Sequence, residues 1–247
     1  MNDEGLFAAV ATDYARYRPA YPAALFDWLA AHSPGHDLAW DVGCGNGQAS
    51  LPLAERFRRV CASDLSARQI AAAPVHAAVD YRVAPAHDSG LPAASVDLVC
   101  AAQAAHWFDL EPFYREVRRV LKPGGVLALW TYQLLALGDE MQPIVETFYR
   151  DELGPWWPPE RRWVDEGYRT LPFPFTELPT PPFVIEVEWT LADFLGYLRT
   201  WSATRNLMQA ENRDPTQLLG ERLAPLWGEG RQTVRWPIAL RAGRDEV

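Results

Sequence analysis

Hydrophobic positions in the first half of the chain come in short, almost wholly apolar runs. Segments whose apolar residues recur three or four positions apart lie between these runs. Apolar runs of this length that alternate with helices are typical of parallel strands covered by helices on both faces. We therefore predict an α/β fold, with strands at residues 38–42, 60–64, 81–83, 96–101 and 126–130.

The expected helices have recognisable starts and stops. Pro22 stands near the start of one helix, and Ser66 can cap another. Residues 110–121 carry Phe113 and Val117 at helical spacing, and Lys122-Pro123-Gly124-Gly125 should stop that helix. The first 35 residues are also expected to be helical.

The pattern changes after Tyr132. Residues 134–183 are rich in Pro and aromatic side chains, and this aromatic content argues against a disordered linker. We predict a partly helical insertion that packs over the sheet. Beyond it we expect strands at residues 183–189 and 232–240, a helix at 191–201 and a loose tail at 241–247.

Composition and charge narrow the function. The chain of 247 residues is 49% hydrophobic, and its 23 Lys and Arg against 32 Asp and Glu give a net charge of −9. An acidic protein without a run of basic residues repels phosphate backbones, so we expect no nucleic-acid partner. The first residues lack a basic start and an apolar stretch, so we expect no signal peptide, and no apolar run of the sequence is long enough for a membrane.

Cysteine usage points to the compartment. Cys44, Cys61 and Cys100 each lie in or beside an apolar run, and none has a metal-ligand spacing. Buried free thiols suit a reducing compartment, so we expect a cytoplasmic protein. No set of acidic residues suggests a metal, and none is predicted.

The strongest local signal is the segment Asp41-Val42-Gly43-Cys44-Gly45-Asn46-Gly47-Gln48. A strand, a glycine-rich turn and a helix follow in that order, and glycines let the backbone turn sharply and approach a ligand. Asp64 ends the second strand, where a carboxylate can accept hydrogen bonds from both ribose hydroxyls. The dinucleotide-binding pattern would require glycine where Gln48 stands.

An acid two residues before glycines at every second position resembles the first motif of class I methyltransferases. Asp64-Leu65-Ser66, Ala84-Pro85-Ala86-His87 and the Lys-Pro-Gly-Gly turn before strand five are similar to further motifs of that family. The likeness in order and spacing covers residues 38–132. The segments 14–22, 103–108 and Trp201-Ser202 resemble the type-11 branch, which includes trans-aconitate methyltransferases.

This resemblance implies a Rossmann-like, doubly wound, mostly parallel seven-stranded sheet with an insertion after strand five. It implies a single methyltransferase domain over residues 1–247, with an N-terminal helical cap (1–35), a cofactor-binding core (36–132), an insertion or lid (133–183) and a C-terminal part of the sheet and helices (184–241). The chain should be a monomer or a homodimer.

The cofactor implied is S-adenosyl-L-methionine. The residues assigned to it are Tyr14, Arg18, Asp41, Gly43, Cys44, Gly45, Asp64, Leu65, Ala86, His87 and Gln103. Asp41 can instead bond only the loop backbone. His87 stands where many relatives have an acid, and Asp88 offers an alternative acceptor for the adenine amino group.

Ligands of open α/β sheets bind beyond the carboxyl ends of the strands. His106 follows strand four and is the candidate catalytic residue, while Trp107, Trp130 and Tyr132 are candidates for the substrate pocket. Trp130 can equally pack in the core. The predicted reaction is methyl transfer to a small molecule, with a carboxylate as one acceptor class, and a hydroxyl or amine acceptor would use His106 as base.

Other functions remain open from sequence alone. An NAD(P)-type oxidoreductase can use a similar sheet, and a regulator can bind the cofactor without turnover. The segment Gln103-Ala104-Ala105-His106 differs from the Asn- or Asp-Pro-Pro-aromatic motif of amino-methyltransferases that act on adenine or glutamine. This difference makes those substrates less favoured.

Overall fold

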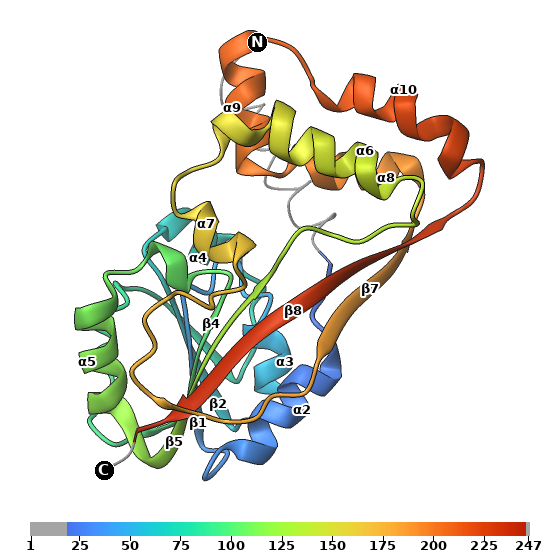
Figure 1. The fold of residues 1–247 in the computed structure, drawn as a ribbon. Coiled ribbons are helices and arrows are strands. Elements are labelled where there is room, and N and C mark those ends of the chain that lie inside the picture. The colour runs from blue at the N-terminus through green and yellow to red at the C-terminus, as the bar shows by residue number, and fades with distance from the viewer. Residues whose placement is uncertain (1–18, 246–247) are drawn as a thin grey trace. The chain divides into compact units, whose positions relative to one another are not determined.

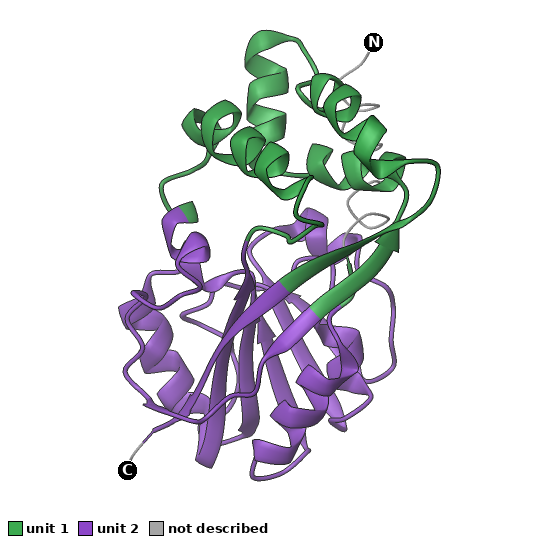
Figure 2. Ribbon diagram, turned by 45° about the vertical axis from the view of Figure 1, so that its right-hand side comes forward, with its two compact units in different colours: residues 1–20, 134–161, 185–236 green, residues 21–133, 162–184, 237–247 purple. Residues whose placement is uncertain are grey.

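The computed structural model describes residues 19–245, which divide into two compact units (Figure 2). Unit 2 contains Tyr21–Gln133, Arg162–Val184 and Pro237–Val247, and unit 1 contains the rest of the chain. The predicted insertion is therefore shared between the units, with its first part in unit 1 and its second part in unit 2. The predicted domain boundaries themselves stay predictions.

The central sheet has eight strands among the described residues, in the order β3-β2-β1-β4-β5-β8-β6, and β7 pairs with β8. The pairs β1–β2, β1–β4, β2–β3 and β4–β5 are parallel, and β8 is antiparallel to both β5 and β6. The predicted mixed, mostly parallel sheet is confirmed. The strands are β1 Leu38–Val42, β2 Arg59–Asp64, β3 Val79–Val83, β4 Val96–Ala102, β5 Leu121–Tyr132, β6 Thr176–Glu177, β7 Phe183–Trp189 and β8 Gln232–Arg244.

Helices cover both faces of the parallel strands in unit 2 (Figure 1). On one face, Phe113 of α5 (Leu110–Val120) packs with Trp40 of β1. On the other, Phe26 of α2 (Ala23–His32) meets the edge of Trp130 of β5. The remaining helices of this unit are the short α3 Ser50–Ala54 and α4 Ala67–Ala71, the 3₁₀ turn Ala105–Trp107 and most of α7 Arg161–Asp165.

Unit 1 is built around aromatic side chains. Trp236 and Tyr197 are almost fully buried, and Tyr149, Trp157 and Trp201 pack with ring centroids 5.0–5.6 Å apart. The Trp-rich composition therefore forms a packed core, as its aromatic content indicated. Its helices are α6 Gln142–Thr147, a π-helical turn Phe148–Glu152, a 3₁₀ turn Gly154–Trp156, α8 Leu191–Arg199, α9 Ser202–Glu211 and α10 Thr216–Trp227.

Two local predictions need correction. Residues 241–244 are not a loose tail, because they continue β8 and pair with β5 from Leu129↔Arg241 to Val126↔Arg244. The Lys-Pro-Gly-Gly segment belongs to β5, although Gly124 has a φ of +75° and the register shifts there between β4 and β5. Pairing with β5 explains the strand at residues 241–244, and α5 ends at Val120, just before the Lys-Pro-Gly-Gly segment that was expected to stop it.

Ser66 caps α4 as predicted, since its side chain accepts a hydrogen bond from the Gln69 amide. The three cysteines are free and buried. Within residues 19–245, every helix is too short or too polar to span a membrane.

Candidate functional site

The parallel pairing of β1, β2 and β4 brings three candidate segments to one edge of the sheet. Val42 pairs with Ser63, and Asp41 pairs with Cys100, so these strands end at similar heights. The glycine turn, Asp64-Leu65 and Gln103 follow their carboxyl ends directly. This edge is where ligands of open α/β sheets bind.

The three glycines of the turn all have positive φ: +69° at Gly43, +56° at Gly45 and +88° at Gly47. A Cβ atom on Gly43 would lie 2.6 Å from the Ala104 Cβ, and one on Gly47 would lie 2.3 Å from the Tyr81 hydroxyl. A Cβ on Gly45 would meet no atom within 4 Å. Two glycines are therefore required by packing, while the backbone of Gly45 borders open space that a ligand can enter.

Asp64 ties this turn to the end of β2. Its Oδ2 accepts a hydrogen bond from the Gly45 amide at 2.9 Å, and its Oδ1 accepts one from the Ser66 amide at 2.8 Å. The Gly43 and Cys44 amides both donate to the Ser63 carbonyl. A carboxylate can accept about four hydrogen bonds, so Asp64 keeps acceptor capacity for a ligand hydroxyl.

Asp41 lies beneath the turn and is fully buried. Ser50 Oγ donates to its Oδ2 at 2.6 Å, and the Cys100 thiol lies 3.9 Å from its Oδ1. Loss of water raises the pKa of Asp41 to about 6, and the nearby charge of Asp64 adds to this effect. Both carboxylate oxygens of Asp41 thus have side-chain partners inside the protein.

Apolar side chains flank the ends of β2 and β3. Leu65 is 74% exposed and Val83 is 56% exposed, and Val83 pairs with Asp64 in the sheet register. In the following loop, Ala86 is half-buried and His87 is exposed. Exposed apolar residues beside polar ones can provide a surface for a planar ring, and Val83 was not among the predicted residues.

Gln103, directly after β4, has the uncommon φ of +55° for a residue with a side chain. Its side-chain nitrogen Nε2 donates to the Tyr132 carbonyl at 3.3 Å, and its side-chain oxygen Oε1 accepts from the Thr131 hydroxyl at 2.6 Å. These bonds hold the residue in a strained backbone conformation, and such conformations cluster at active sites.

His106 lies in the turn that follows and is 8% exposed. Its Nδ1 lies 2.7 Å from the hydroxyl of Tyr168, which is fully buried and has a φ of +59°. The Tyr168 backbone is fixed by hydrogen bonds from its amide to the Trp163 carbonyl and from Arg241 to its own carbonyl. A strained, buried tyrosine therefore orients the histidine.

The candidate pocket residues differ in exposure. Trp107 is 58% exposed, and its ring centroid lies 4.8 Å from that of His106. Trp130 is fully buried, with ring-edge contacts to Tyr21 and Phe26, which matches its alternative role in the core. Tyr132 is 6% exposed.

Other candidates lie elsewhere. Tyr14 and Arg18 are outside the described residues. Sequence reasoning missed Tyr168, because its partner His106 is 62 positions away along the chain. It missed Ser50, because the burial of its partner Asp41 is set by the fold. Glu116, which holds the loop after β3, was also missed. In unit 1, Arg199 forms an ion pair with Asp214 at 2.8 Å.

The raised pKa of Asp41 predicts a pH dependence of stability. The folded protein holds this proton up to about pH 6, whereas in the unfolded chain the Asp41 carboxyl has its ordinary pKa of 3.8. The folded state therefore binds more protons between these values, and this contribution to stability is lost as the pH rises through 6. Relative to Asp41→Asn, the unfolding free energy of the wild type should fall between pH 4 and pH 7. Urea unfolding followed by tryptophan fluorescence would check this, and a constant difference would contradict it.

Comparison with known proteins agrees with this geometry. Residues 40–129 match a family model described as a methyltransferase domain. A Dictyostelium discoideum protein named as a methyltransferase is 34% identical over 212 residues, which cover 84% of this chain and 81% of the relative. An uncharacterised methyltransferase of Mycobacterium tuberculosis (strain H37Rv) is 35% identical over 188 residues, covering 74% of this chain and 70% of that protein.

A solved structure from Anaeromyxobacter dehalogenans, described as a type II methyltransferase, is 51% identical. It matches with a TM-score of 0.88 over 92% of this chain and 98% of its own. The family model, the relatives and this structure agree on one class of enzyme, the methyltransferases. The chain therefore belongs to the class I S-adenosylmethionine-dependent methyltransferases.

Proposed function

We propose that the acceptor of this S-adenosylmethionine-dependent methyltransferase is a small molecule and that a carboxylate oxygen receives the methyl group. The observation that supports placing the acceptor beyond β4 is the buried His106–Tyr168 pair, with a Nδ1–hydroxyl distance of 2.7 Å, and the choice of a carboxylate follows the resemblance to trans-aconitate methyltransferases. The net charge of −9 disfavours nucleic acid, and three buried free thiols suit the cytoplasm. The likeness to trans-aconitate methyltransferases stays a prediction.

The residues of the carboxyl edge fit the cofactor. The open approach at Gly45 can take the methionine part, and the spare acceptor capacity of Asp64 suits the two ribose hydroxyls. Asp41 is fully buried, and its carboxylate accepts a hydrogen bond from Ser50, which lies just after the turn. We assign ribose recognition to Asp64 and assign to Asp41 the positioning of the turn.

Adenine is proposed to lie between the exposed side chains of Leu65 and Val83 and the loop of Ala86 and His87. The two apolar side chains offer contact to the ring faces. The exposed His87 and Asp88 offer acceptors for the amino group. This arrangement would recognise the base by apolar contact with the ring and by a hydrogen bond to its amino group.

When bound, S-adenosylmethionine supplies an electrophilic methyl group whose leaving group is a neutral thioether. A carboxylate is already ionised at neutral pH and needs no base, so the protein's task is to align it and exclude water. If the Tyr168 hydroxyl donates to Nδ1, the proton of neutral His106 resides on Nε2, which can then donate to the acceptor. The products are a methyl ester and S-adenosylhomocysteine.

The family assignment sets the oxidoreductase alternative aside. A hydroxyl or amine acceptor remains the competing proposal within the family, and it reverses the histidine's role. In that case Nδ1–H donates to Tyr168, and Nε2 takes the acceptor's proton. The same His106–Tyr168 geometry supports either direction, so the acceptor's chemistry separates them.

Removing the carboxylate of Asp64 should weaken cofactor binding. We expect Asp64→Ala to bind S-adenosylhomocysteine at least about tenfold more weakly, because a lost charged hydrogen bond costs about 1.5–3 kcal/mol. Titration calorimetry measures this directly. Asp80→Ala is a matched control, since Asp80 lies on the adjacent strand and pairs with Arg82. Equal affinity of Asp64→Ala and the wild type would refute the ribose assignment.

A carboxylate acceptor should leave a chemical signature. Incubation with cofactor carrying a tritiated methyl group and a panel of di- and tricarboxylic acids, alcohols and amines is expected to label a carboxylic acid. Mild alkali then hydrolyses a methyl ester and releases the label as volatile methanol, whereas methyl ethers and methylamines keep it. Label that resists alkali would contradict carboxylate methylation and favour the competing proposal.

With that acceptor, Tyr168→Phe should lower kcat about fivefold while the affinity for S-adenosylhomocysteine stays unchanged, because one orienting hydrogen bond of about 1 kcal/mol is lost. Tyr114→Phe is the control, since it likewise deletes one tyrosine hydroxyl, which donates to the Pro172 carbonyl rather than bonding His106. The pH–rate profile separates the two roles of His106. A rate that rises as histidine loses its proton indicates a base, and a rate that does not rise indicates a donor.

A further inference from the structure

The loop after β3 is anchored at both ends within unit 2. At its start, the Ala84 amide donates to the Asp64 carbonyl at 3.1 Å. At its end, the amide and the hydroxyl of Ser89 both donate to Glu116 Oε1, at 2.9 and 2.5 Å. The segment Pro85–Asp88, which includes the proposed adenine contacts, is thus a short span between two fixed points.

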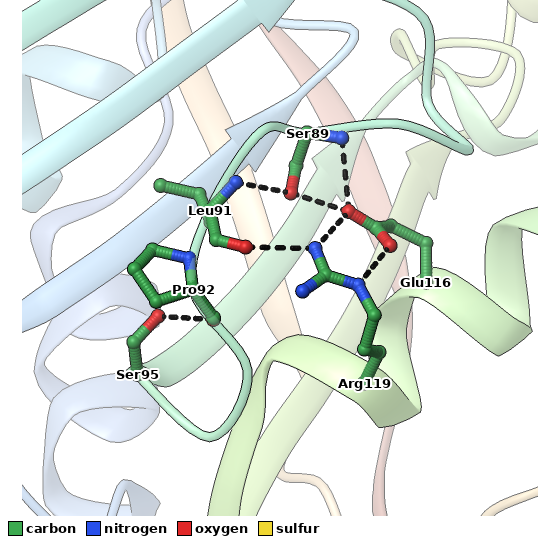
Figure 3. Close-up of polar contacts among 6 residues, drawn as sticks. All are labelled: Ser89, Leu91, Pro92, Ser95, Glu116 and Arg119. Atoms are coloured by element: carbon green, nitrogen blue, oxygen red, sulfur yellow. Dashed lines mark hydrogen bonds and ion pairs between the residues drawn. The ribbon is translucent and has the colours of Figure 1, made fainter.

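Glu116 and Arg119 lie one turn apart on α5 and form the second anchor together (Figure 3). Arg119 Nε bonds Glu116 Oε2 at 2.7 Å, and Arg119 Nη2 bonds the Leu91 carbonyl at 2.7 Å. The Ser89 hydroxyl also accepts from the Leu91 amide at 3.1 Å. We call Glu116, Arg119 and Ser89 the loop clasp.

The loop clasp is largely removed from water at its acidic end. Glu116 is 7% exposed and Ser89 is 2% exposed, while Leu91 belongs to the core packed against α5. The hydrogen bonds from Arg119, followed by those from Ser89, lower the pKa of Glu116 to about 2 despite the opposing effect of burial. The carboxylate therefore stays ionised and keeps its acceptor role over the whole neutral range.

The charge of Arg119 in the clasp interacts with Asp88, one of the proposed adenine contacts. The pKa of Arg119 is raised first by its hydrogen bonds to Glu116 and further by the negative charges of Glu116 and Asp88. Asp88 directly precedes Ser89, and its amide bonds the Pro85 carbonyl at 3.3 Å. A shift of Ser89 would therefore move Asp88 and His87.

We infer that the loop clasp positions the loop of His87 and Asp88 for the amino group of adenine, so that Glu116 sets the enzyme's preference for adenine over other purines without touching the cofactor. The inference rests on the proposed adenine placement. It makes Glu116 a positioning residue. Loss of the clasp should release one end of the loop, and its ordering would then weaken binding of the base.

The test compares S-adenosylhomocysteine with S-inosylhomocysteine, in which an oxygen replaces the adenine amino group. The wild type should prefer the adenine compound. In Glu116→Ala, affinity for S-adenosylhomocysteine should fall about tenfold, affinity for S-inosylhomocysteine should stay nearly constant, and the preference should shrink accordingly. Calorimetry on the full chain gives both constants, and circular dichroism verifies folding.

Two further variants keep the test decisive. Glu111→Ala removes an exposed acid from the same helix, whose ion pair with Arg115 spans 3.8 Å, and it should bind like the wild type. Ser89→Ala deletes one hydroxyl of the clasp and keeps the ion pair. It should reduce the preference in the same direction but by less, and it replaces Glu116→Ala if that variant fails to fold.

Three results would overturn the inference. Equal weakening of both ligands in the clasp variants would show a merely structural role, and unchanged affinities would show no role in binding. If the wild type binds both ligands equally, the adenine placement is wrong and the inference falls with it. The ribose assignment is tested separately, because Asp64→Ala would still lose affinity in that case.

Discussion

The pairing of β1 with β2 is the constraint from which the site follows. It places the end of β1 beside Ser63 and Asp64, so that Gly43 and Cys44 donate to the Ser63 carbonyl and Gly45 donates to the Asp64 carboxylate. These bonds hold a backbone whose φ is positive at three glycines, one at every second position. The turn that we propose receives the cofactor is therefore formed by backbone geometry, and Asp64 is held by the Gly45 and Ser66 amides.

Three carboxylates of unit 2 show how surroundings assign different tasks to the same group. Asp41 is fully buried, and loss of water raises its pKa to about 6. Glu116 is also buried, but bonds from Arg119 and Ser89 lower its pKa to about 2. Asp64 is only partly buried and keeps room for a ligand. The buried carboxylate of Asp41 bonds Ser50 beneath the turn, and that of Glu116 holds the loop after β3. The partly exposed carboxylate of Asp64 can still accept from a ligand.

The order of elements in unit 2 was predictable because apolar runs, glycines and caps are local signals. The same signals predicted that Asp64 and the glycine turn lie at strand ends, where the structure has them. The His106–Tyr168 contact was not predictable, because it joins residues 62 positions apart and requires a tyrosine with positive φ. The strand at 241–244 was missed because its polar, glycine-containing sequence gives no alternation, and its pairing with β5 forms it.

The most direct test of the account is a crystal structure of the protein with S-adenosylhomocysteine. We expect the ribose hydroxyls to bond Asp64, the amino-acid part to lie against Gly45, and the base to lie beside Leu65 and Val83. A ligand bound away from the carboxyl ends of β1 and β2, with Asp64 contacting only Gly45 and Ser66, would contradict it.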